Sequence, residues 1–98
     1  IIKYQGIFKS FIKKYTNMRE VDVMNPAHHK IYKTIGLKIM YYRNKNDMSQ
    51  YQLGDVLDKD QSHISRIEHA GVGLTIDTLC DIAKALNVEP YLLLKPKD

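Results

Sequence analysis

Polar side chains that can donate or accept hydrogen bonds are concentrated in one short segment of the chain. They are Gln61, Ser62, His63, Ser65 and Arg66. Ile64 and Ile67 would form the inner face of a helix over 61–69, which leaves the polar residues facing outward. A glutamine amide both donates and accepts, which matches N6 and N7 of adenine, and an arginine can approach a guanine or a phosphate. The segment therefore has the chemistry to contact base edges and phosphates.

A second short helix is expected just before this segment. Ser49 and Gln52 make a capping box, in which each side chain binds the other residue's backbone N–H. The core face of that helix is predicted to consist of Leu53, Val56 and Leu57. A tight turn at 58–60 leads into helix 61–69, for which Asp60 is a good N-cap. Two short helices joined in this way have the geometry of a helix-turn-helix.

Helices are also predicted on both sides of this pair, and residues 25–98 show no sustained two-residue alternation typical of strands. Asn25 and Pro26 predict a helix start. The apolar face of that first helix consists of Ile31, Ile35, Ile39 and Tyr42. Gly71 and Gly73 are expected to end helix 61–69, because glycine readily adopts the left-handed conformation.

The last third of the chain predicts two further helices. Thr75 caps the first of these, and Asn87 is placed to end it. Its core stripe consists of Leu79, Ile82, Ala83 and Leu86. Pro90 then begins a short final helix, residues 90–94. The expected fold is all-α, with five helices in residues 25–98.

Two runs of residues resemble the Cro/C1-type (XRE-like) family of helix-turn-helix transcriptional regulators. The first run comprises SQYQL at 49–53 and QSHISRIE at 61–68, and the second comprises LTIDTL at 74–79 and IAKALNV at 82–88. The resemblance covers roughly residues 29–94. It implies a lambda-repressor-like domain that binds double-stranded DNA, with helix 61–69 in the major groove.

The resemblance also implies roles for single residues. Gln50 would contact a phosphate while supporting Gln61, and the bases would be contacted by Gln61, Ser62 and Arg66. Arg43 and Glu68 would form an internal ion pair that ties the first helix to the third. The full set of candidate DNA contacts is Gln50, Lys59, Gln61, Ser62, His63, Ser65, Arg66 and His69.

Positive charge is concentrated in the first half of the chain. Residues 1–47 carry ten Lys or Arg against three Asp or Glu, whereas residues 48–98 carry five against eight. Acidic residues at 58 and 60 would repel phosphate. We therefore expect weak, salt-sensitive DNA binding by a monomer, with affinity that depends on dimerisation and on lysines of the first half.

Residues 1–24 lie outside the resemblance and form an N-terminal extension. Their apolar residues have helical spacing: Tyr4, Ile7, Phe8, Phe11, Ile12 and Tyr15. We expect an amphipathic arm that covers a second apolar stripe on the first helix, formed by Leu37, Met40 and Tyr41. A helix at a membrane surface and a loose tail are the alternatives.

The apolar run Tyr91, Leu92, Leu93 and Leu94 cannot all face one small core, so part of it is expected to contact a partner subunit. The predicted assembly is a homodimer on a palindromic operator. A phage repressor, a restriction–modification controller and an antitoxin remain open as subclasses. The rival hypothesis is an antitoxin or interaction module that uses the same fold mainly to bind a toxin or other protein.

Other functional classes lack sequence support. Cys80 is the lone cysteine, and the spacing of the four histidines supplies no closed set of metal ligands, so neither a metal nor another cofactor is expected. No nucleophile elbow or glycine-rich phosphate loop is present, so an enzyme is not expected. The 98 residues lack an apolar run long enough to span a bilayer, and we expect a cytoplasmic protein without a membrane partner.

Overall fold

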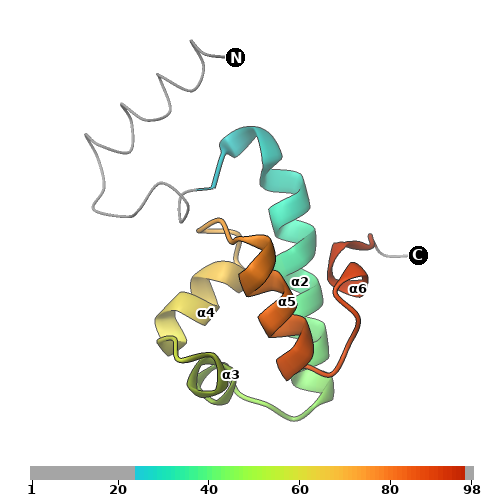
Figure 1. Cartoon of the computed structure of the whole chain (residues 1–98). Helices are drawn as coiled ribbons and strands as arrows, with labels where there is room; N and C mark the ends of the chain where they lie inside the picture. Colours follow the sequence, from blue (N-terminus) through green and yellow to red (C-terminus); the bar gives the residue numbers. More distant parts are fainter. Residues whose placement is uncertain (1–23, 97–98) are drawn as a thin grey trace.

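The computed structural model describes residues 24–96, and its regular elements are all helical. A short 3-10 helix, η2 (Pro26–His28), precedes α2 (His29–Lys45), α3 (Gln50–Leu57), α4 (Gln61–Glu68), α5 (Ile76–Ala85) and α6 (Tyr91–Leu94). The expectation of an all-α fold with five α-helices is confirmed for this part of the chain. In Figure 1, α3 and α4 lie on one side of the long α2, and α6 lies on the other. The predicted arm falls almost wholly outside the described residues.

The helices begin where the sequence predicts. The Ser49 hydroxyl accepts from the backbone N–H of Gln52 at 3.0 Å, and the Gln52 side chain accepts from the Ser49 N–H at 2.8 Å, so the capping box is confirmed. Thr75 caps α5 through the backbone N–H of Thr78. Asp60 occupies the N-cap position of α4, but its side chain makes no capping hydrogen bond. The turn backbone, with Asp60 in an extended conformation, is enough to start that helix.

The end of α4 differs from the sequence prediction. No glycine of the described residues has a positive φ; the left-handed residues are Asp47, Asp58, Ala70 and Asn87. At the end of α4, Gly71 N–H donates to the Arg66 carbonyl at 2.7 Å and Ala70 N–H donates to the Ile67 carbonyl at 3.2 Å. These two bonds make a Schellman motif with Ala70 in the left-handed position. The prediction that Gly71 and Gly73 end α4 in the left-handed conformation is therefore wrong. Asn87 ends α5 as predicted.

Ala70 holds the left-handed position because its methyl group is buried. Only 4% of its surface is exposed, so packing offsets part of the steric cost of that backbone conformation for a residue with a Cβ. The chain can then turn from α4 towards α5 with an apolar group beneath the turn.

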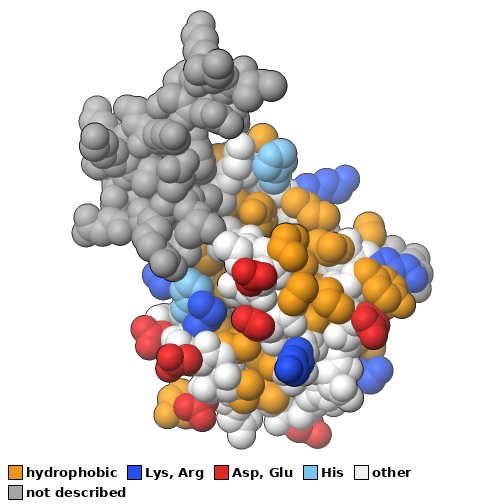
Figure 2. Space-filling view, viewed as in Figure 1, with side chains coloured by type: hydrophobic (Ala, Val, Ile, Leu, Met, Phe, Trp, Pro, Cys, Tyr) orange, Lys and Arg blue, Asp and Glu red, His pale blue; other side chains and the backbone are white. Residues whose placement is uncertain are grey.

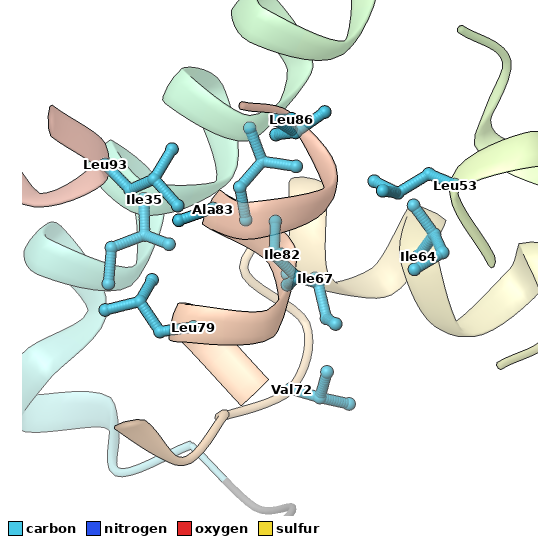
Figure 3. Packing of buried hydrophobic residues seen from close by; sticks show 11 residues of the cluster. Ile35, Leu53, Ile64, Ile67, Val72, Leu79, Ile82, Ala83, Leu86 and Leu93 are labelled. Carbon is cyan, nitrogen blue, oxygen red and sulfur yellow. The ribbon is translucent and has the colours of Figure 1, made fainter. Parts of the chain in front are cut away.

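One core is shared by all five α-helices, as Figure 3 shows. Its buried members are Ile35, Ile39, Leu53, Ile64, Ile67, Val72, Leu79, Ile82, Ala83, Leu86 and Leu93. Val56, predicted to be part of the α3 core face, is instead 63% exposed. A helix of eight residues can turn only a narrow face inward, and Leu53 with the half-buried Leu57 occupies it.

Gly36 allows α2 and α4 to approach each other closely. A Cβ built at this position would lie 2.3 Å from the Glu68 carbonyl oxygen and 2.8 Å from that of Ile67. Both neighbours are backbone atoms at the end of α4, so they cannot move aside as a side chain would. The close approach places Glu68 next to α2, where its partner Arg43 lies.

We expect Gly36→Ala to lower the free energy of unfolding by ~3 kcal/mol or more, because the added methyl group must push α4 away from α2. Gly71→Ala is the matched control, since a Cβ there meets its nearest atom at 3.4 Å and the backbone φ is not positive. Urea titration followed by circular dichroism measures both. Equal stability of the two variants would contradict the close-packing account.

Candidate nucleic-acid interface

The turn between α3 and α4 is held by backbone contacts. Asp58 has φ 56°, and the Lys59 N–H donates to the Gly54 carbonyl at 2.8 Å. A Cβ at Gly54 would lie 2.5 Å from the Lys59 carbonyl oxygen, so this glycine is needed where the turn crosses back over α3. The buried side chains of Leu53 on α3 and Ile64 on α4 pack the two helices together, and Figure 3 shows these side chains next to each other. The helix-turn-helix geometry is thus present at residues 50–68.

The polar residues of α4 other than the buried Glu68 lie on the side of the helix opposite Ile64 and Ile67. Gln61, Ser62 and Arg66 are exposed, whereas His63 and Ser65 are half-buried. His69, which directly follows α4, is exposed, and its Nδ1 lies 2.8 Å from the Ser65 carbonyl. Among the candidate contacts outside α4, Lys59 and Gln50 are half-buried. The eight residues therefore lie on α4, directly after it, on the turn before it and at the start of α3.

Arg43 and Glu68 form a buried ion pair between α2 and α4. Arg43 Nε donates to Glu68 Oε2 at 2.6 Å, and Nη2 donates to Oε1 at 3.1 Å. Arg43 Nη1 also donates to the Met48 carbonyl at 2.8 Å, in the loop that leads to α3. With Arg43 9% and Glu68 2% exposed, the pair joins α2, this loop and α4 from inside the domain.

Two glutamines extend this buried pair to the surface. Gln50 Nε2 donates to Glu68 Oε1 at 2.9 Å, and Gln61 Nε2 donates to Gln50 Oε1 at 2.6 Å. Gln50 at the start of α3 and Gln61 at the start of α4 are thereby held against each other. The bond from Gln50 to Glu68 has no counterpart in the sequence expectations. A signal for it exists, because an acid on the inner face of α4 needs several donors.

Acidic residues surround the turn. Asp55, Asp58 and Asp60 are all exposed. Figure 2 shows acidic side chains gathered at the end of the molecule where α3 and α4 lie. The Lys and Arg residues between positions 48 and 69 are Lys59 and Arg66. A polyanion approaching α4 would therefore meet a mixed field rather than a uniformly positive one.

Sequence reasoning missed Tyr51. It follows Gln50 at the start of α3, is 71% exposed, and carries a hydroxyl that can donate to an anion. The available signal was an aromatic residue outside the spacing of the α3 core face. Tyr51 adds a hydrogen-bonding group beside Gln50.

The candidate partner-contact residues divide between core and surface. Leu93 is fully buried, Leu92 is half-buried, and Leu94 is exposed, as is Tyr91 at 63%. On α2, Leu37 and Tyr41 are exposed and Met40 is half-buried. Apolar surface is thus present both on α6 and on the outer side of α2.

Residues 24–96, which the structure describes, contain neither a membrane-spanning helix nor a cluster of metal ligands. No helix there is both long and apolar enough to cross a membrane. Across the same residues, no three side chains among His, Cys, Asp and Glu are grouped to hold a metal ion.

Comparison with known proteins finds similarity in sequence and in fold. A family model described as helix-turn-helix matches residues 39–93. The control protein C.SmaI of Serratia marcescens is 40% identical over 53 residues, a match that spans 53% of this chain and 63% of that protein.

Two solved structures share the fold. The restriction-modification controller protein C.AhdI of Aeromonas hydrophila has a TM-score of 0.64 at 23% identity, covering 67% of this chain and 96% of that one. The hypothetical transcription factor NHTF from Neisseria has a TM-score of 0.66 at 20% identity, covering 78% and 90%. At these identities the two structures show similarity of fold alone.

We expect Arg43→Ala to lower the free energy of unfolding by ~3–5 kcal/mol, because it leaves the Glu68 carboxylate buried without its main donor. Lys33→Ala is the matched control, as it removes an exposed cation from the same helix. Thermal and urea unfolding measure both changes. A loss below ~1 kcal/mol in Arg43→Ala would show that the ion pair does not hold the helices together.

Proposed function

The chain belongs to the Cro/C1-type helix-turn-helix family, and from that premise we propose that it is a transcriptional regulator that reads double-stranded DNA with α4. The observation that carries this proposal is the exposed polar face of α4, with Gln61 held by Gln50 at the start of α3. An α-helix fits the major groove, and residues at its N-terminal end reach base edges. Gln61, Ser62 and Arg66 would then face bases.

The remaining candidates would contact the phosphates. Gln50 lies at the N-terminus of α3, where free backbone N–H groups favour an anion. Lys59, His63, Ser65 and His69 lie on the turn, on α4 or directly after it, and would bind along the flanking strand. Because exposed aspartates lie beside these residues, binding by one protomer is expected to be weak and salt-dependent.

A homodimer on a palindromic operator is the assembly we propose. Tyr91 and Leu94 expose apolar surface on α6, and the neighbouring hollow is lined by residues of α5 and of the segment around α6, including Val88 and Leu92. A two-fold pair joined there would present two α4 helices, and half-sites on B-DNA repeat at about 34 Å. Two half-sites would supply the affinity that one protomer, with acidic residues around its α3–α4 turn, lacks.

Within the regulators, we propose a control protein of a restriction–modification system over a phage repressor or an antitoxin. The support is the 40% identity to a protein named as a control protein. A methyltransferase or endonuclease gene beside this one would support the assignment. A neighbouring toxin or integrase gene would contradict it.

The acidic turn favours a second candidate, a module that uses this fold to bind a protein. Asp58 and Asp60 lie where a phosphate-binding surface is better served by cations. A gel shift at low salt with random duplex DNA separates the two functions. Binding at low salt supports the regulator, and its absence supports the protein-binding module.

The domain division is also part of the proposal, with an extension over residues 1–24 and the DNA-binding domain over residues 25–98. The extension is proposed as an amphipathic arm that covers the Leu37–Tyr41 side of α2, where apolar side chains are exposed. Removing residues 1–24 without a change in melting temperature or oligomeric state would contradict a packed arm.

We expect Arg66→Ala to weaken binding to the selected operator by ~1–3 kcal/mol, because it removes a contact to a base or phosphate. Lys84→Ala is the charge-matched control, since Lys84 is exposed on α5. Fluorescence anisotropy across a range of salt concentrations measures both. Similar losses in the two variants would show that only net charge matters.

Tyr91→Glu is expected to convert the dimer into a monomer, because it places a charge in the proposed apolar contact. The side chain is already exposed, so the fold should be retained. Sedimentation velocity measures the change, with Val56→Glu on α3 as a control for adding the same charge to another exposed apolar site. A dimer that survives Tyr91→Glu would place the interface elsewhere.

A further inference from the structure

We infer that Glu68 is a positioning residue for base reading: acting through Gln50, it fixes which end of the Gln61 side-chain amide is free to meet DNA. The inference rests on the proposed function and concerns the same surface. It goes beyond a structural role for Glu68, because it assigns to a buried side chain an effect on which base is preferred.

The orientation of the two glutamine amides is set first at the ion pair of Arg43 and Glu68. Arg43 can only donate hydrogen bonds, and the Glu68 carboxylate can only accept them. Arg43 Nη2 donates to Glu68 Oε1 at 3.1 Å, and the same oxygen lies 2.9 Å from the Gln50 amide. The end of the Gln50 amide that faces Glu68 must therefore be its NH₂ group. The Gln50 carbonyl oxygen is left to face the other way.

The orientation of the Gln50 amide in turn sets the orientation of the Gln61 amide at the surface. The Gln50 carbonyl oxygen can only accept, so the end of the Gln61 amide that lies 2.6 Å from it must be Nε2. Gln61 then has its Oε1 and one remaining N–H free. Each orientation follows from what the neighbouring group can donate or accept. None depends on telling oxygen from nitrogen by position.

Burial makes this arrangement specific. Glu68 is 2% exposed, so its carboxylate cannot exchange protein donors for water, whereas Gln61 is exposed and would otherwise flip its amide freely. No buried side-chain nitrogen or oxygen of the described residues lacks a partner. A flip of Gln50 would place its carbonyl oxygen against the Glu68 carboxylate, and two acceptors would then face each other without a proton between them.

The consequence is a preference between purines. One free acceptor beside one free donor matches N6 and N7 of adenine. The opposite orientation of Gln61 would turn both N–H groups of its amide outward, which matches the two acceptors O6 and N7 of guanine. Glu68 therefore biases the base read by Gln61 towards adenine and against guanine.

The first experiment compares Glu68→Gln with Arg43→Lys. Glutamine at position 68 can turn either its oxygen or its NH₂ group towards Gln50, which makes both orientations of Gln61 accessible. Arg43→Lys weakens the same buried ion pair but leaves the carboxylate in place. Both variants are compared with the unmodified protein at a temperature where circular dichroism shows all three folded, using duplexes selected from a random pool.

At the base read by Gln61, we expect a roughly tenfold preference for adenine over guanine in the unmodified protein and in Arg43→Lys. In Glu68→Gln the preference should fall to about twofold or less, or reverse. An equal fall in both variants would show that only stability is at work, and no fall in Glu68→Gln would overturn the inference.

A second measurement needs neither DNA nor a variant. In the unmodified full chain, NMR should detect coupling through the hydrogen bond from the Gln61 side-chain nitrogen to the Gln50 side-chain carbonyl carbon. Coupling in the reverse sense, from the Gln50 nitrogen to the Gln61 carbonyl carbon, or free rotation of the Gln61 amide would overturn the inference. If no duplex is selected at all, the proposed function fails, while this measurement still decides the orientation.

Discussion

A carboxylate buried inside a small domain must accept hydrogen bonds from several donors. In this domain the donors to the Glu68 carboxylate position the polar residues at the start of α3 and on α4. Glu68 accepts from Arg43 on α2 and from Gln50 at the start of α3, so it joins both helices to α4. Removing either charge alone would leave the other buried and unpaired, which costs far more than an exposed ion pair contributes. One buried group thus links α2, α3 and α4, in addition to the backbone contacts of the turn and the apolar core.

In this fold, glycines allow two backbones to approach closely, whereas other residues adopt the left-handed conformation at helix ends. Gly36 and Gly54 stand where a backbone from another segment passes too close for a Cβ. The helix ends use Asp47, Asp58, Ala70 and Asn87 instead, although each carries a Cβ. Close approach of two backbones and reversal of chain direction are therefore met by different residues.

Much of this fold follows from local rules that can be applied to the sequence. The capping box at Ser49, the cap at Thr75 and the core stripe of α5 depend only on neighbours in the chain, and all are present in the structure. Gly71 and Gly73 were assigned the left-handed position that Ala70 occupies, because the choice of residue there depends on what packs beneath the turn. Val56 was misplaced because the width of a buried face is set by the helices opposite.

The candidate site was only partly predictable for the same reason. Outward-facing residues of α4 follow from the positions of Ile64 and Ile67, but the contact of Gln50 with Glu68 depends on the angle between two helices. The spacing of residues does not show which way a side-chain amide is oriented. A carboxylate fixes that orientation for every amide linked to it, because it only accepts hydrogen bonds.

We propose that the exposed face of α4, with the start of α3, is the surface that meets DNA. Titration of the ¹⁵N-labelled full chain with a short random duplex at low salt, followed by NMR, would locate that surface. We expect the largest shifts at Gln50 and from Gln61 to His69. Shifts confined to α5 and α6, or none at DNA concentrations that saturate weak non-specific binders, would contradict it.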